Sequence, residues 1–190
     1  MKYFPRSVFL VFALFSIFVS VAGAQRRDFV TEEEAELIRE HQEIDMRIEV
    51  ITKFIDRRLA AAGIAGHTWS APKKNSEKWG AEPKGTRTEL LSDVRRLLQK
   101  SIDDVDDIAS RTSTAIEGNE ATGKLFPKAV RNLAAAATRY KPILGTELSR
   151  SKDQSERGLL QQSIEFCDQI IEAAANLPAE TKEEKKKSKT

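Results

Sequence analysis

The stretch from Thr31 to Ala62 contains no Gly or Pro and keeps helical spacing throughout. One row of residues recurs at alternating intervals of three and four, which places it on one helix face: Leu37, His41, Ile44, Ile48, Ile51, Ile55, Leu59 and Ala62. A second, shorter row of Met46, Val50 and Phe54 falls on nearly the opposite side. This pattern predicts one long amphipathic helix that serves as the spine of a helical bundle. The second row leads to two alternatives: later parts of the chain cover both sides of this helix, or one side contacts a partner.

Later segments keep the same helical pattern, and two helices begin with capping boxes at Thr31–Glu34 and Thr86–Glu89. The spacing predicts a second helix from Thr86 to about residue 117 and a fourth from about 153 to 176. Between them, two prolines indicate either a kinked third helix ending near Arg150 or two shorter pieces. The fold class expected is therefore all-α: an antiparallel bundle of about four helices occupying residues 25–178.

The two ends of the sequence differ in composition from this domain. Residues 1–24 combine a basic start, an apolar run and small residues at Ala22 and Ala24, which predicts a secretory signal peptide cleaved before Gln25. We therefore expect an exported protein, periplasmic or extracellular, with no transmembrane span once the leader is removed. An uncleaved leader acting as an anchor is the alternative. Residues 179–190 form a Lys-rich tail that we expect to be disordered, and that could make weak contact with the cell envelope.

Charge and cysteine content narrow the classes of function. Lys2 and Arg6 lie in the leader, so 29 basic and 29 acidic residues remain after it. A balanced charge gives no reason to expect binding to nucleic acid. Cys167 is the single cysteine in the sequence, so an internal disulfide cannot form. Its position on an apolar helix face indicates a buried side chain rather than a reactive thiol.

The segment from Gly63 to Gly85 is the longest predicted loop and contains six Gly or Pro residues. Loops of this length are usually functional or disordered. It holds both tryptophans of the chain, Trp69 and Trp79, together with His67 and several lysines. Two interpretations stay open: the indole rings hold the loop against the bundle, or they contact a ligand or partner.

Two short motifs suggest chemistry that their context does not support. Residues 118–124 have the glycine and lysine spacing of a P-loop, but a helix precedes them and Leu125 stands where Ser or Thr would bind magnesium. Residues 103–107 resemble the DDxxD motif of isoprenoid synthases over five positions, without the second acidic motif those enzymes need. Asp103, Asp104 and Asp107 could form a weak metal site on a helix face, although a solvated acidic face is the simpler interpretation.

These observations favour a non-enzymatic role without a cofactor. We expect an exported structural or protein-interaction protein that binds a protein partner or a second copy of itself. The candidate contacts are Trp69, Trp79 and His67 of the loop and the row Met46, Val50 and Phe54. The alternative is an exported ligand- or ion-binding sensor that uses the loop or the acidic face at 103–107.

Overall fold

The computed structural model describes residues 27–64, 67–73, 76–112 and 120–178, and the described chain is all-helical, with no strand. The all-α prediction is confirmed. Five α-helices and one short 3-10 helix follow one another in the order α1 (Glu32–Glu40), α2 (Ile44–Ala61), η1 (Ser76–Trp79), α3 (Arg87–Thr112), α4 (Glu120–Arg150) and α5 (Gln154–Ala175). The predicted leader, the tail and most of the P-loop-like segment lie outside the described residues.

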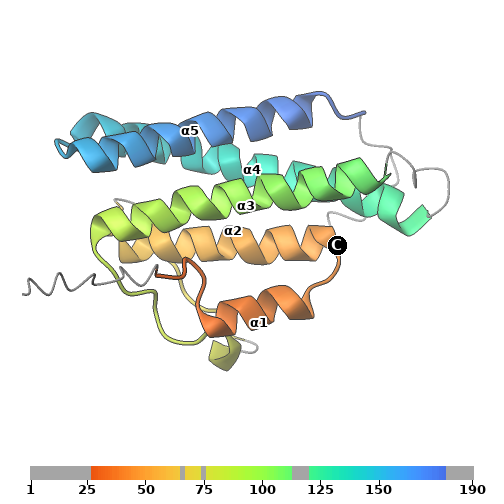
Figure 1. Ribbon diagram of the computed structural model, residues 1–190, viewed down its shortest axis with the longest axis horizontal. Coiled ribbons are helices and arrows are strands. Elements are labelled where there is room, and N and C mark those ends of the chain that lie inside the picture. Colours follow the sequence, from red (N-terminus) through yellow and green to blue (C-terminus); the bar gives the residue numbers. More distant parts are fainter. Residues whose placement is uncertain (1–26, 65–66, 74–75, 113–119, 179–190) are drawn as a thin grey trace, which may run out of the picture.

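The expected continuous helix from Thr31 to Ala62 is wrong, because the chain breaks it into α1 and α2 at residues 41–43. His41 ends α1 in a non-helical conformation, and its Nδ1 lies 2.7 Å from the Leu37 carbonyl oxygen. The break lets α1 fold back beside α2, below the long helices in Figure 1. Tertiary contacts made by α1 therefore outweigh the local preference for one continuous helix.

Several other helix ends follow their sequence signals. Both predicted capping boxes are present: Glu34 N–H donates to Thr31 Oγ1, and Thr86 N–H donates to the Glu89 carboxylate at 2.6 Å. Asp153 caps α5. After α2, Gly63 adopts a positive φ of 67°, and the Ile64 amide donates back to Leu59 in a Schellman motif. α4 is one helix that includes Pro127 and Pro142.

The four long helices form two hairpins that pack side by side (Figure 1). Helices α2 and α3 are antiparallel, as are α4 and α5. Across the hairpins, however, α2 lies beside α4 in the same direction: Lys128 near the start of α4 pairs with Asp45 at the start of α2, and Tyr140 Oη donates to Thr52 farther along. Helix α3 likewise lies beside α5 with both starts together, since Arg87 pairs with Glu156. Neighbouring helices are thus antiparallel within each hairpin and parallel between them.

The hydrophobic core lies between the two hairpins and includes the predicted main row of α2. Its Ile48, Ile51, Ile55 and Leu59 side chains have no exposed surface. Helix α5 contributes Cys167, whose burial raises the thiol pKa to about 12. No described helix is long and apolar enough to span a membrane.

Two glycines give a matched test of backbone conformation. We expect Gly63→Ala to destabilise the fold by about 1 kcal/mol, because a left-handed φ disfavours a Cβ atom. A Cβ at Gly63 would meet no atom within 4 Å, so this cost is conformational and not steric. Gly158→Ala, inside α5 with equally open surroundings, should instead stabilise by about 0.5–1 kcal/mol. Urea unfolding curves of both variants check the opposite signs; equal signs would contradict this account of Gly63.

Candidate functional site

A buried ionic cluster lies where the N-terminal segment, α1 and the loop after α2 meet the α2–α3 hairpin. It consists of Glu34 from α1, Arg57 and Arg58 from α2, and Asp93 from α3. At most 3% of each residue is exposed. Buried charges persist in proteins only when they are paired and hydrogen-bonded, so these four residues are the most unusual chemical feature of the fold.

Glu34 is the centre of the cluster. Its Oε1 accepts from Arg57 Nη1 at 2.5 Å and also from Arg58 Nη1, and its Oε2 accepts from Arg58 Nη2 at 2.6 Å. The same Oε2 accepts from the Thr31 amide at 3.1 Å, which completes the capping box. One carboxylate therefore caps α1 and forms ion pairs with two buried arginines.

The two arginines also bind backbone carbonyl oxygens of segments that lie outside the bundle. Arg57 Nη2 donates to the Ala81 carbonyl at 2.7 Å, and Arg58 Nη2 donates to the Phe29 carbonyl at 2.9 Å. Burial lowers the pKa of Arg57, and the nearby charge of Glu34 opposes that shift. The arginines thereby fasten both the N-terminal segment and the loop to α2.

Asp93 extends the cluster toward the surface. Its carboxylate pairs with Arg27 and lies 3.9 Å from Arg58 Nε. Burial raises the pKa of Asp93, while the charges of Arg27 and Arg58 act in the opposite direction. A surface pocket of about 290 Å³ opens beside it, and its lining residues are Arg27, Glu89, Ser92, Asp93, Arg95 and Arg96.

Aromatic rings cover the other side of Arg57. The guanidinium carbon lies 4.9 Å from the ring centroid of Trp69 and 5.9 Å from that of Trp79, within the range of cation–π attraction. The two indole rings are 5.4 Å apart, and Trp79 packs edge-on against Phe54 at 5.7 Å. These contacts hold the loop against α2, which is the first of the two interpretations of the tryptophans.

A second polar group fixes the start of the loop. His67 Nε2 lies 3.1 Å from Asp56 Oδ1, and Arg139 Nη2 from α4 lies 3.1 Å from both oxygens of the same carboxylate. The hydroxyl of Tyr140, whose pKa burial raises, accepts from Arg139 and donates to the Thr52 carbonyl. His67 is thus joined to α2 and, through Asp56, to α4, and it does not line the Arg27 pocket.

The structure separates the predicted row on α2. Met46 is 44% exposed, whereas Val50 is 5% exposed and Phe54 is fully buried. Helix α1 lies beside α2 on this side (Figure 1), and Trp79 of η1 packs against Phe54. Other parts of the same chain therefore cover most of the side of α2 that carries Val50 and Phe54, and Met46 stays exposed.

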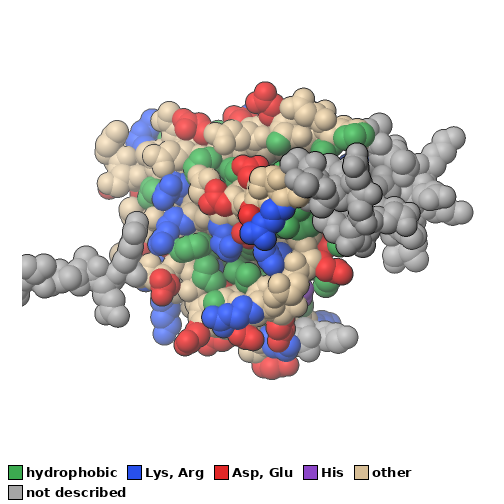
Figure 2. Space-filling view, turned by 45° about the vertical axis from the view of Figure 1, so that its right-hand side comes forward, with side chains coloured by type: hydrophobic (Ala, Val, Ile, Leu, Met, Phe, Trp, Pro, Cys, Tyr) green, Lys and Arg blue, Asp and Glu red, His purple; other side chains and the backbone are tan. Residues whose placement is uncertain are grey.

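The predicted acidic residues of α3 each interact within their own helix. Asp103 accepts from Gln99, Asp104 from Lys100, and Asp107 from Arg111. Within the described part of the chain, no group of three potential ligand residues is placed to hold a metal ion. Figure 2 shows charges of both signs interspersed over the visible face.

Sequence reasoning missed Glu34, Arg57, Arg58 and Asp93 as one cluster. Glu34 was fully explained by the capping box, and Arg57 and Arg58 by the negative end of the helix dipole. A signal was available, because both arginines continue the Met46, Val50 and Phe54 row at helical spacing. Cations that continue an apolar row indicate a buried counter-ion elsewhere in the chain.

Comparisons with protein-family models, curated proteins and solved structures find no match for this chain. The function is therefore inferred from the geometry of the chain itself.

Proposed function

We propose that this chain is an exported, non-enzymatic helical protein with a structural or protein-interaction role, acting on a protein partner or on a second copy of itself. Export rests on the leader-like composition of residues 1–24. The main support for this role is that the charged and aromatic side chains of the candidate site bind other parts of the same chain. The buried arginines, Glu34, the tryptophans and His67 bind one another and the backbone, and so fix α1 and the loop onto the bundle.

In this arrangement, the side chains hold α1 and the loop after α2 as a layer on the outside of the bundle, and we do not assign them a catalytic role. Several contacts hold the described part of the loop of residues 62–86, among them His67 to Asp56, Trp79 to Phe54, and the Ala81 carbonyl to Arg57. A loop held in this way presents a fixed surface to a partner, which reduces the ordering cost of association. Trp69 is partly exposed within that layer.

Met46 gives the proposal a specific point of contact. It is the exposed large hydrophobic residue in the described part of the chain, at 44%, and it lies in the first turn of α2. Beside it are Asp45 and the paired Lys128. An exposed apolar side chain with charged neighbours is suited to the rim or centre of a protein–protein contact.

Sedimentation velocity across a wide concentration range tests self-association, and pull-down with the immobilised chain tests partner capture. We expect Met46→Lys to weaken association or capture about tenfold or more, since burying an added charge at an interface costs over 1.4 kcal/mol. Gln162→Lys adds the same charge at an exposed position of α5 and should change neither measurement. A chain that stays monomeric and captures partners equally in both variants would count against the proposal.

A further inference from the structure

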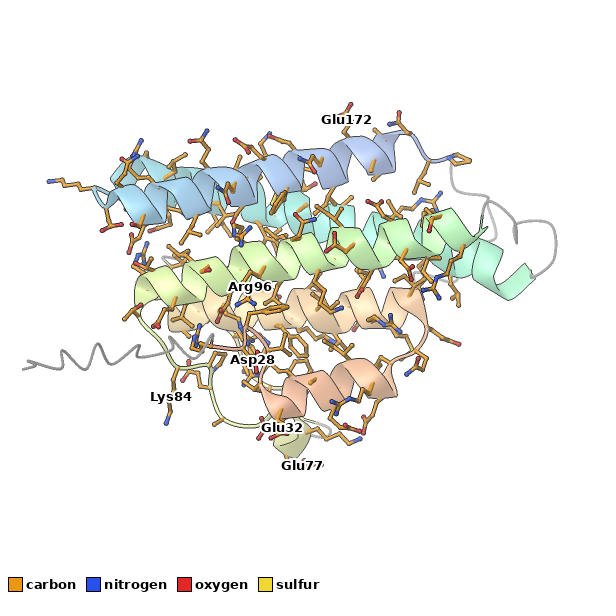
Figure 3. The ribbon with its side chains drawn as sticks, viewed as in Figure 1. Asp28, Glu32, Glu77, Lys84, Arg96 and Glu172 are labelled. Carbon is orange, nitrogen blue, oxygen red and sulfur yellow. The ribbon has the colours of Figure 1, made fainter. Side chains whose placement is uncertain are left out.

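The pocket beside Asp93 lies between α3 and the N-terminal segment, and its lining carries more positive than negative charge. Arg27, Arg95 and Arg96 contribute cations, and Glu89 and Asp93 contribute carboxylates. Figure 3 shows Arg96 on the side of α3 that faces the segment carrying Asp28. The volume of about 290 Å³ falls at the lower limit of small-molecule sites, which span roughly 300–1,000 Å³.

Both carboxylates of the pocket already have partners. Glu89 Oε2 accepts from the Thr86 amide at 2.6 Å and from the Thr86 hydroxyl at 2.9 Å. Asp93 is paired with Arg27 and lies beside Arg58 of the buried ionic cluster. The three arginines of the lining outnumber its two carboxylates, so the pocket keeps a formal excess of one positive charge.

Several hydrogen-bond donors of the pocket are unused. Arg96 donates from Nη1 to the Arg27 carbonyl at 3.3 Å and stacks on Phe29 at 4.3 Å, which fixes its side chain and leaves other N–H groups available. Arg95 and Ser92 have no hydrogen bond or ion pair with any described residue. A positioned guanidinium, an unpartnered guanidinium and a hydroxyl therefore line the same space.

We propose that this pocket binds a small oxyanion, a phosphate or a carboxylate, between Arg95, Arg96 and Ser92. Planar guanidinium groups match the paired oxygens of these anions and form short charge-assisted hydrogen bonds with them. The fixed Arg96 supplies a preorganised donor. Arg95, the preceding residue of α3, supplies a second guanidinium to the anion. This site goes beyond the proposed partner-binding role and does not depend on it.

Thermal unfolding with inorganic phosphate, succinate or chloride at equal ionic strength tests the site. A ligand that binds the folded state raises its stability, so phosphate or succinate at tenfold its dissociation constant should raise Tm by about 3 °C or more over chloride. A rise with phosphate alone assigns a phosphate site, and a rise with succinate assigns a carboxylate site. No rise with either anion overturns the proposal.

Substitutions test whether the anion-dependent rise in Tm comes from this pocket. Arg95→Gln should abolish the anion-dependent rise with little change in Tm in chloride, because Arg95 makes no hydrogen bond or ion pair with a described residue and Gln keeps part of its side chain. Ser92→Ala should reduce the rise. Arg111→Gln removes a positive charge from an exposed position of the same helix, where it pairs with Asp107, and should keep the full rise. An equal rise in Arg95→Gln and Arg111→Gln would show general charge screening and overturn the site.

Discussion

Replacing Glu34 with Gln is expected to lower the free energy of unfolding by about 3–5 kcal/mol, because it removes the buried carboxylate that pairs with Arg57 and leaves Arg58 with Asp93 alone. Gln preserves the size of the side chain, and its oxygen can still accept from the Thr31 amide, so the capping box survives. The loss therefore reports on the negative charge that Glu34 places beside Arg57 and Arg58. Urea denaturation followed by far-UV circular dichroism measures it.

Glu36→Gln is the matched control in the same helix. Glu36 is 60% exposed and pairs with Arg39 one turn away. Its replacement should cost under about 1 kcal/mol, as is usual for exposed pairs. Similar losses for the two variants would contradict a central role for Glu34. Replacing Glu34, Arg57 and Arg58 together by Leu, Met and Leu should recover most of the lost stability, since apolar groups of similar volume often substitute for buried ion clusters.

Trp79→Ala is expected to destabilise the chain by about 3–5 kcal/mol, the range seen when a buried aromatic ring is removed. Trp79 is 5% exposed and packs against Phe54, Trp69 and the guanidinium of Arg57. Its loss opens a cavity beneath η1 and weakens the aromatic cover of the buried ionic cluster. Urea unfolding followed by circular dichroism gives the magnitude.

Trp69→Ala removes the same type of ring from a partly exposed position and should cost less than Trp79→Ala. Because η1 contacts α1, Trp79→Ala should also speed hydrogen exchange of α1 amides more than that of α5 amides. Uniform acceleration over both helices, or a larger loss of stability for Trp69→Ala, would be inconsistent with Trp79 as the residue that holds this layer.

Much of the secondary structure could be predicted because its signals are local. Capping residues at Thr31, Thr86 and Asp153 and the glycine after α2 mark helix ends through contacts within five residues. The break at His41 could not be predicted, since no Gly or Pro marks it. The break allows α1 to bring Glu34 to arginines more than twenty positions later, and the helical spacing of apolar residues does not reveal such a long-range pair.

The candidate site was predictable in part for the same reason. The two tryptophans stood out by composition, and their loop was expected to hold them against the bundle or a ligand. Their partner Arg57 lies near the end of a helix, where a cation is already favoured by the helix dipole. The neighbouring residues therefore gave no sign that Arg57 also forms a buried ion pair and contacts the tryptophans. Asp93 lies on α3 and meets Arg27 only in the folded chain, 66 positions away.

The parallel placement of α2 beside α4 has a consequence for how the chain folds. Each hairpin forms from neighbouring sequence, whereas side-chain bonds between the hairpins join residues 60 to 88 positions apart, as in the Arg87–Glu147 and Thr52–Tyr140 pairs. Closing such long loops costs entropy before any contact is gained, so rapid local pairing should precede the slower docking of one hairpin on the other. The transition state for folding should then contain well-formed hairpins and an incomplete interface between them.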